Sequence, residues 1–269
     1  MKKRIVSLLC TVALLAAMLP ISAFAVPSVV DGSDIPTSGQ CGENLYWEFD
    51  TNTGTLTISG TGAMEDYTKE QKAPWRSCAF FQGPKTLVIQ DGVTYIGDYA
   101  FRDGDDWFPP FDFQGELCIP DSVQSIGEYA FDYSRGFTGD LILPDGITEI
   151  GAYAFALCNF DGVLHLPDDL SVIGERAFGD CEDLNGDLVL PDGITDIGVE
   201  AFQACNFTGE LVIPGSVTTV GDRAFQYCSG ITEVYCSDGI TALGSAFSHC
   251  RGLKRVTIPS SVQTIDTDV

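Results

Sequence analysis

Cysteine is the residue type with the most reactive chemistry in this chain, and it recurs at a regular spacing. Five cysteines each follow a phenylalanine by three residues: Cys158, Cys181, Cys205, Cys228 and Cys250. Thiols repeated in this way could bind a metal, form disulfides or pack as small apolar groups. Structural metal sites usually draw ligands from close pairs such as C-x-x-C, which this sequence lacks, so no metal site is predicted.

The residues at the equivalent position of two earlier repeats favour packing over chemistry. Gly104 and Ser134 occupy it there, so the position accepts small residues of quite different reactivity. Side chains on stacked parallel coils also point the same way, and five thiols cannot all pair. We therefore predict a ladder of buried free thiols. Cys41 and Cys78 lie outside this pattern, and a disulfide between them is plausible in an exported chain.

The remaining chemistry-bearing residues give no catalytic signal. The chain has only two histidines, His165 and His249, and it lacks the G-x-S-x-G, P-loop, H-E-x-x-H and G-x-G-x-x-G motifs. Its 38 acidic residues are so numerous that a pair of carboxylates carries no information about glycoside hydrolysis. We expect no catalytic residue and no cofactor, and hence a protein that is not an enzyme.

The cysteine spacing is part of a longer repeat. Seven phrases of the type IGxxAF occur, from YIGDYAF to the shorter ALGSAF, and after the first interval they recur about every 23 residues. A period of this length is typical of a solenoid, in which each repeat is one supersecondary unit. We predict that the phenylalanines form an internal ladder: Phe101, Phe131, Phe155, Phe178, Phe202, Phe225 and Phe247.

A second phrase with the same period predicts the strands that position these residues. In DLILPDG, for example, Leu141 and Leu143 are two apart and so point to one side of a short strand, which Pro144 then ends. The Ile, Ala and Phe of IGxxAF are spaced as on one turn of α- or 3₁₀-helix. The predicted fold is a repeat solenoid, with a parallel β-sheet on one side and short helical turns on the other; the resemblance described next implies that it is of the leucine-rich-repeat type.

Together these phrases resemble the BspA-like leucine-rich repeats of bacterial surface proteins. The last full unit matches that pattern at Phe247, Cys250, Leu253, Val256, Ile258, Pro259 and Val262. Residues 41–67, followed by Ala73-Pro74-Trp75, look like the leader that often precedes such repeats. The resemblance implies a solenoid, secretion or surface display, and binding to macromolecules of a host or a neighbouring cell. It implies no catalysis.

The composition along the chain predicts a division into three segments. Residues 1–25 combine basic MKKR, an apolar run and a final Ala-Phe-Ala, which predicts a cleaved signal peptide, with a retained membrane anchor as the alternative. Residues 26–80 should form a β-rich N-terminal cap, because Leu45, Trp47 and Phe49 alternate before turn residues. Residues 81–269 should form about seven repeats. The expected location is secreted or on the cell surface.

Net charge and the outward strand positions suggest where a partner would bind. A formal charge of −24 argues against nucleic acid and anionic membranes. The predicted strands expose an apolar row beside an acidic row, which favours an extracellular protein ligand of basic character. The alternative is a solvent-screened surface of good strand formers. The rows are Ile142, His165, Val189, Val212 and Tyr235, and Glu116, Asp140, Asp187, Glu210 and Glu233.

A second candidate surface lies in the insertion that lengthens the first repeat, residues 102–115. Trp107 and Phe108, with Phe111 and Phe113 after them, could form a contact surface or could pack over the first coils. Two further functions stay open. One is a carbohydrate-binding module in which Trp107 and Tyr235 stack against sugars, and the other is a structural surface component that self-associates.

Overall fold

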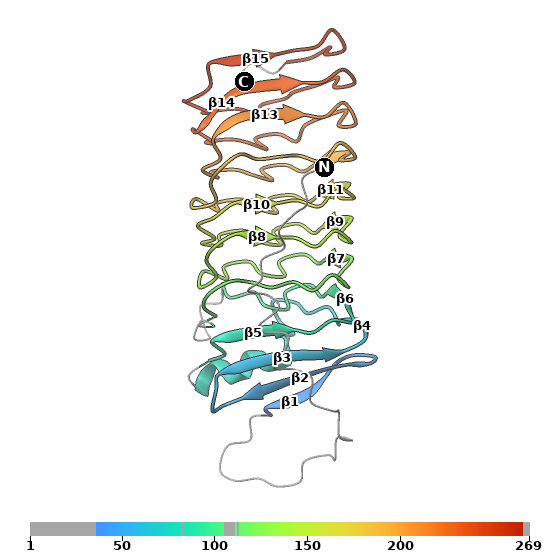
Figure 1. Ribbon diagram of the computed structural model, residues 1–269, viewed down its shortest axis with the longest axis vertical. Helices are drawn as coiled ribbons and strands as arrows, with labels where there is room; N and C mark the ends of the chain where they lie inside the picture. Colours follow the sequence, from blue (N-terminus) through green and yellow to red (C-terminus); the bar gives the residue numbers. More distant parts are fainter. Residues whose placement is uncertain (1–35, 82, 105–110, 112, 266–269) are drawn as a thin grey trace, which may run out of the picture. The chain divides into compact units, whose positions relative to one another are not determined.

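The computed structural model describes residues 36–81, 83–104, 111 and 113–265. The predicted signal peptide therefore lies outside the described residues. After an N-terminal antiparallel meander, the described chain winds into coils that stack on one another (Figure 1). Within the described residues, no helix has the length and apolar character needed to cross a membrane.

An antiparallel meander precedes the coils. The alternation of apolar and polar residues produces it, since Leu45, Trp47 and Phe49 are buried while the residues between them are exposed. The last strand of the meander then pairs in parallel with the first strand of the coils, so one sheet continues into the other. The meander consists of β1 (Ser38–Gly42), β2 (Leu45–Asp50) and β3 (Thr55–Gly60), and the first strand of the coils is β5 (Thr86–Ile89).

Six of the eight DLILPDG-type phrases form the predicted strands, which are short and parallel, whereas residues 116–119 and 187–190 form no strand. Their inward residues, such as Leu141 and Leu164, are buried and lie opposite each other in register. Proline closes most of these strands after one inward pair, which explains their length. Besides β5, they are β8 (Leu141–Ile142), β10 (Leu164–His165), β13 (Gly209–Ile213), β14 (Ile231–Cys236) and β15 (Arg255–Thr257).

A second parallel ladder, which the sequence did not predict, precedes each IGxxAF glycine. Ile126, Ile150, Ile173 and Ile197 pair in register along it and are all buried. Most of its strands have two residues, too few for a pattern of alternation to appear in the sequence. They are β4 (Gly62–Ala63), β6 (Val93–Ile96), β7 (Ser125–Ile126), β9 (Glu149–Ile150), β11 (Val172–Ile173) and β12 (Asp196–Ile197).

The expected helical turns are wrong in detail. Each full IGxxAF segment is a run of turns, because the residue two before the ladder phenylalanine is left-handed, as at Tyr153 (φ 59°) and Glu200 (φ 56°). A left-handed residue stops helical winding, and the amide two residues after it donates to the following coil. The amide of Phe178, for instance, donates to Ala201 O at 2.8 Å. The described residues contain one helix, the 3₁₀-helix η1 (Pro74–Phe81).

The ladder phenylalanines stack face to face through the centre of the coils, as predicted. Consecutive rings from Phe155 to Phe247 are 5.4–5.5 Å apart between centroids and nearly parallel. Trp75 of η1 continues the stack, with its ring 5.4 Å from that of Phe101. Each ring is buried, so this ladder removes a large apolar area from water.

The glycine of each IGxxAF phrase is required by the closeness of neighbouring coils. A Cβ atom at Gly198 would lie 2.5 Å from the backbone nitrogen of Glu175 and 2.5 Å from the carbonyl carbon of Gly174. Both are backbone atoms of the preceding coil and cannot rotate away. A side chain here would therefore push two coils apart, which is why glycine recurs at this position.

Replacing Gly198 with alanine should consequently destabilise the protein by about 1–3 kcal/mol, because overpacking forces the backbone to shift. Gly193 of the same coil is the matched control, since a Cβ at that position would meet nothing closer than Asp168 O at 3.8 Å. Gly193→Ala should change stability by less than about 1 kcal/mol. Urea unfolding of both variants measures the difference, and equal stabilities would contradict the close approach of coils.

Candidate functional site

The outward residues of the DLILPDG strands form one exposed apolar row. Ile142, Val189 and Val212 are 46, 73 and 47 % exposed, which is high for aliphatic residues in a folded chain. His165 lies beside Ile142 in register, and Tyr235 beside Val212. The structure thus places all five residues of the predicted row on the strand side of the coils.

The acidic row runs beside it, two residues earlier along each coil. Glu210 and Glu233 are direct partners in the ladder, so like charges lie on adjacent strands. Two residues of the row have partners within the chain. Asp140 Oδ1 accepts a hydrogen bond from the amide of Val163 at 2.8 Å, and Glu233 forms an ion pair with Arg255 at 3.3 Å. The side chains of Glu116, Asp187 and Glu210 are exposed to solvent.

The predicted thiol ladder is buried, but its thiols do more than fill space. Each cysteine thiol donates to the carbonyl oxygen of the phenylalanine one coil before; Cys205 Sγ, for example, lies 3.1 Å from Phe178 O. Ser134 makes the same bond to Phe101 O at 2.8 Å. Six of the seven repeats therefore carry a small hydrogen-bond donor at this position, and Gly104 is the exception. The bonds run from Cys158, Cys181, Cys205, Cys228 and Cys250.

Burial also makes these thiols chemically inert. It raises the pKa of Cys181 to about 12 and that of Cys250 to about 11, because the thiolate would lose its hydration. A thiol that stays protonated is a poor nucleophile and a poor metal ligand. Among the described residues, no group of three or more His, Cys, Asp or Glu could hold a metal ion.

The disulfide that the sequence allowed between Cys41 and Cys78 is not formed. Both are buried free thiols, and Cys78 Sγ instead lies 3.7 Å from Pro36 O. Burial raises the pKa of Cys41 to about 12 and that of Cys78 to about 11. The meander and η1 are therefore joined by packing rather than by a covalent bridge.

The insertion packs at least part of its aromatic content inward. Phe111 and Phe113 are buried, and the guanidinium of Arg76 lies 4.3 Å from the ring centroid of Phe111. Asp103 accepts the amide of Phe111 at 2.7 Å and pairs with Arg76 at 3.0 Å. This agrees with packing over the first coils for these two residues. Trp107 and Phe108 lie outside the described residues.

A surface row on the turn side was not anticipated. It occupies the left-handed position of each IGxxAF segment and begins with a stack of Tyr99, Tyr129 and Tyr153, whose centroids are 4.7 and 4.6 Å apart. Arg176 and Glu200 continue it with a 2.6 Å ion pair. The sequence did hold a signal, because the letters at this position change from Y, Y, Y to R, E, R.

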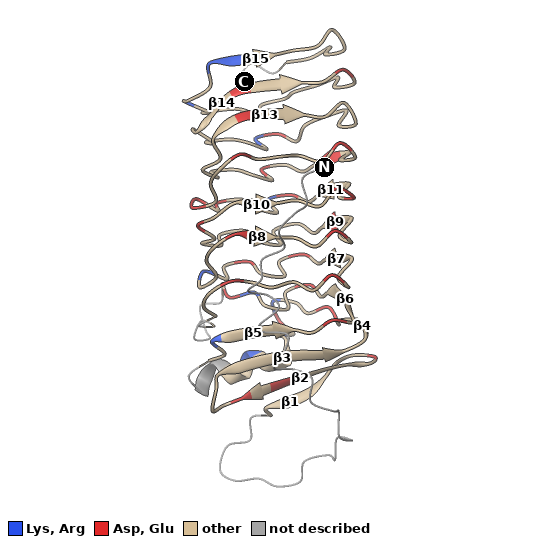
Figure 2. Cartoon of the chain, viewed as in Figure 1, with Lys and Arg blue, Asp and Glu red and all other residues tan. Residues whose placement is uncertain are grey.

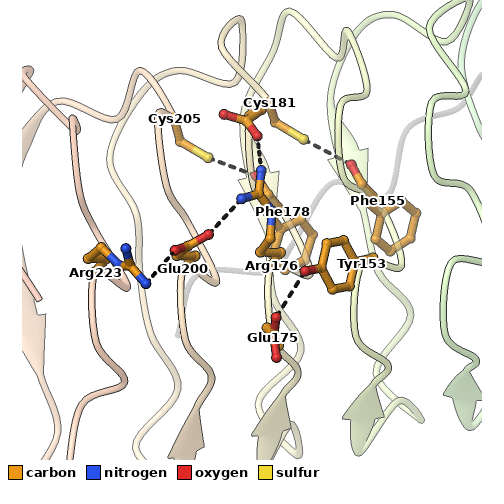
Figure 3. A network of polar contacts seen from close by, with 10 residues as sticks. Tyr153, Phe155, Glu175, Arg176, Phe178, Cys181, Glu200, Cys205 and Arg223 are labelled. Carbon is orange, nitrogen blue, oxygen red and sulfur yellow. Dashed lines mark hydrogen bonds and ion pairs between the residues drawn. The ribbon is translucent and has the colours of Figure 1, made fainter.

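Figure 3 shows part of this row together with two thiols of the ladder, each set making its own contacts. Glu200 links Arg176 to Arg223, which lies 3.0 Å away, while Tyr153 donates its hydroxyl to Glu175 at 2.9 Å. Arg176 also pairs with Asp180 of its own coil. These side chains form ion pairs and hydrogen bonds with one another across coils. The row therefore stabilises the stacking of the coils and offers few unpaired polar groups to a partner.

Comparison with known proteins gives one family match. The family described as the BspA type leucine rich repeat region matches in 6 copies, over residues 115–164 and 162–269. No curated protein matches the chain.

Solved structures of leucine-rich repeat proteins are also similar. One from Bacteroides ovatus is 25 % identical, with a TM-score of 0.48, and the match covers 83 % of this chain. The chain spans about half of that protein, 48 % of its length. A leucine-rich repeat protein of T. pallidum is 20 % identical over 81 % of each chain, with a TM-score of 0.42. A leucine-rich cell surface protein from Faecalibacterium prausnitzii is 20 % identical, covering 88 and 86 %, with a TM-score of 0.32.

The donor role of the thiol ladder predicts a difference between two substitutions of Cys205. Cys205→Ala leaves Phe178 O without its donor inside the core and should cost about 1–3 kcal/mol. Cys205→Ser keeps a donor, as Ser134 does naturally, and should cost clearly less. Urea unfolding compares the two, and an alanine variant as stable as the serine variant would argue for packing alone.

Thiol reactivity gives an independent check. With an alkylating reagent at pH 8, the native chain should be labelled at the partly exposed Cys118 and not at the five ladder cysteines, whose burial disfavours the thiolate. Mass spectrometry of peptides locates the label, and a denatured sample provides full labelling. Rapid modification of Cys205 in the native chain would refute this assignment.

Proposed function

Because the chain belongs to the BspA-type leucine-rich repeat family, we propose that it is an exported, non-enzymatic protein that binds other proteins in an adhesin-like role. The proposed location is secreted or on the cell surface, supported by the signal-peptide pattern of residues 1–25. Proteins of this architecture present long, regular surfaces, which suit the recognition of large partners.

The observation that carries the proposal is the apolar row on the strand side. Its most exposed member, Val189, leaves 73 % of its surface in water; Val212 follows it in the next repeat, and His165 and then Ile142 precede it. Exposed apolar residues repeated on one face and bordered by charge are typical of a protein-contact surface. The acidic row beside it would favour a basic partner through electrostatic attraction.

A screen of extracellular matrix and host-surface proteins against the purified chain tests this function. For any protein that binds, the triple variant Ile142→Ser/Val189→Ser/Val212→Ser should weaken affinity by about tenfold or more, since each residue would lose apolar burial at the interface. Glu116→Gln/Asp187→Asn/Glu210→Gln should weaken binding of a basic ligand and reduce its salt dependence.

The matched control removes the same number of charges elsewhere. Asp169, Glu182 and Asp192 are exposed on turns, so Asp169→Asn/Glu182→Gln/Asp192→Asn should bind as the unchanged chain does. Equal loss in this control would show that net charge, rather than the acidic row, attracts the ligand. A ligand whose affinity is unaffected by both row variants would place the contact surface elsewhere.

A further inference from the structure

The acidic row and the apolar row lie on one face of the strands, two residues apart. In β13, Glu210 and Val212 are exposed, whereas Leu211 and Ile213 are buried. Residues two apart along a strand are separated by about 6.6 Å, so the two rows form parallel lines across the coils. One element of a partner protein, about 10 Å wide as an α-helix is, could therefore contact both rows at once.

This face carries negative charge that no lysine or arginine interrupts. From residue 116 to residue 235, the outward positions of the strand phrases hold five carboxylates and one histidine. Figure 2 shows acidic residues near the starts of β13 and β14 and no basic residue on either strand. Glu116, Asp140, Asp187 and Glu210 are exposed. A partner on this face should therefore be basic, because surfaces of opposite charge attract each other.

Contacts with glycine show that the rows keep one register from coil to coil. A Cβ atom at Gly209 would lie 2.7 Å from Asp187 Oδ1, so this glycine lies directly against the acidic side chain of the preceding coil. The pairing recurs at four consecutive steps between coils, including the step from residues 187–190, which form no strand. The pairs are Gly139 with Glu116, Gly162 with Asp140, Gly186 with Val163, and Gly209 with Asp187. The outward side chains therefore lie in continuous lines, and the glycines leave room for the carboxylates.

The spacing of the coils favours one form of partner. Adjacent parallel strands are about 4.8 Å apart, whereas an α-helix advances about 5.4 Å per turn. Side chains three or four apart on a helix would therefore follow successive coils, with a drift of about 2.4 Å over four steps that a lysine side chain can span. An extended strand advances about 6.6 Å per two residues and would drift by about 7 Å over the same steps. A polyproline II segment advances about 9.3 Å per turn and would meet only alternate coils.

We propose that the strand side binds a basic amphipathic α-helix of a partner protein, which lies across the strands along the stack of coils. The apolar stripe of the helix would cover the apolar row, and lysine or arginine on one flank would face the acidic row. Opposite Val163, where the acidic row is interrupted, a small or apolar residue fits instead. Binding would remove Val189 from water and relieve the repulsion between neighbouring carboxylates. This mode of binding rests on the proposed function and specifies the form and charge of the partner.

The probe is a fluorescently labelled peptide of about 18 residues, capped at both ends, which as a helix is about 27 Å long. Leucine occupies every third or fourth position, a lysine lies beside each leucine on one flank of the helix, and alanine fills the rest. The peptide should bind the purified chain at least about tenfold more tightly than a peptide of the same composition in scrambled order. Replacing each lysine with glutamate should abolish binding. Equal affinity of the ordered and scrambled peptides would overturn the proposal, because net charge alone would then explain binding.

Helix formation on binding tests the form of the partner. Far-ultraviolet circular dichroism should show more helix in the bound peptide than in the free peptide, because a short isolated helix is marginal in water. Proline in place of two central alanines should weaken binding at least about tenfold, since proline breaks the helix. Equal affinity of the proline peptide, or binding without a gain of helix, would refute a helical partner and favour an extended one.

The triple variants of the two rows test the place of binding. The apolar-row variant and the acidic-row variant should each weaken peptide binding about tenfold or more, whereas the control variant at Asp169, Glu182 and Asp192 should bind within about twofold of the unchanged chain. Equal affinity in all three variants would overturn the site.

Two results separate a failure of the helical partner from a failure of the proposed function. A screened protein that binds through both rows, while the helical peptide does not bind, would overturn the helix and leave the proposed function standing. A protein ligand unaffected by the row variants, while the peptide depends on both rows, would count against the proposed contact surface and support the helix site.

Discussion

The fit of one coil against the next is the constraint on which the rest of this structure depends. Adjacent coils approach so closely that a single Cβ at Gly198 would lie 2.5 Å from the backbone of the preceding coil. At this distance the ladder amides reach the carbonyls of the neighbouring coil, as Phe178 N reaches Ala201 O. Stacked rings and buried isoleucines follow from the same spacing, because identical side chains then lie above one another.

The same close fit explains the role of the cysteines, which are the most reactive residue type in the sequence. A thiol at the ladder position is close enough to bond the carbonyl of the phenylalanine one coil before, and Cys205 does so at 3.1 Å. Once buried and bonded, it serves stability rather than reactivity. On the turn side, Glu200 pairs with both Arg176 and Arg223 across coils, so these side chains also stabilise the stacking.

The parts of this fold that could be predicted from the sequence are those encoded locally and repeated. Phe178 and its equivalents are evident from their period, and Leu141 and Leu143 from their alternation. The left-handed backbone at Tyr153 and Arg176 could not be read in the same way, because these residues rarely adopt it and only the neighbouring coil imposes it. The bond from Cys205 to Phe178 joins residues 27 apart, so its geometry depends on how two coils stack.

The candidate surfaces also differ in how far the sequence predicts them. The exposure of Val189 follows from its place in the repeat pattern, whereas the packing of Arg76 on the ring of Phe111 joins residues far apart in the chain and could not be predicted from the sequence.

Native-state hydrogen exchange tests the fit between coils most directly. The amides of Phe131, Phe155, Phe178 and Phe202 each donate to an alanine carbonyl of the next coil and lie beneath buried rings. They should be among the slowest to exchange in the whole chain, opening only when coils separate. Exchange as fast as that of the exposed turn residues of the same coils, such as Asp192, would contradict the account.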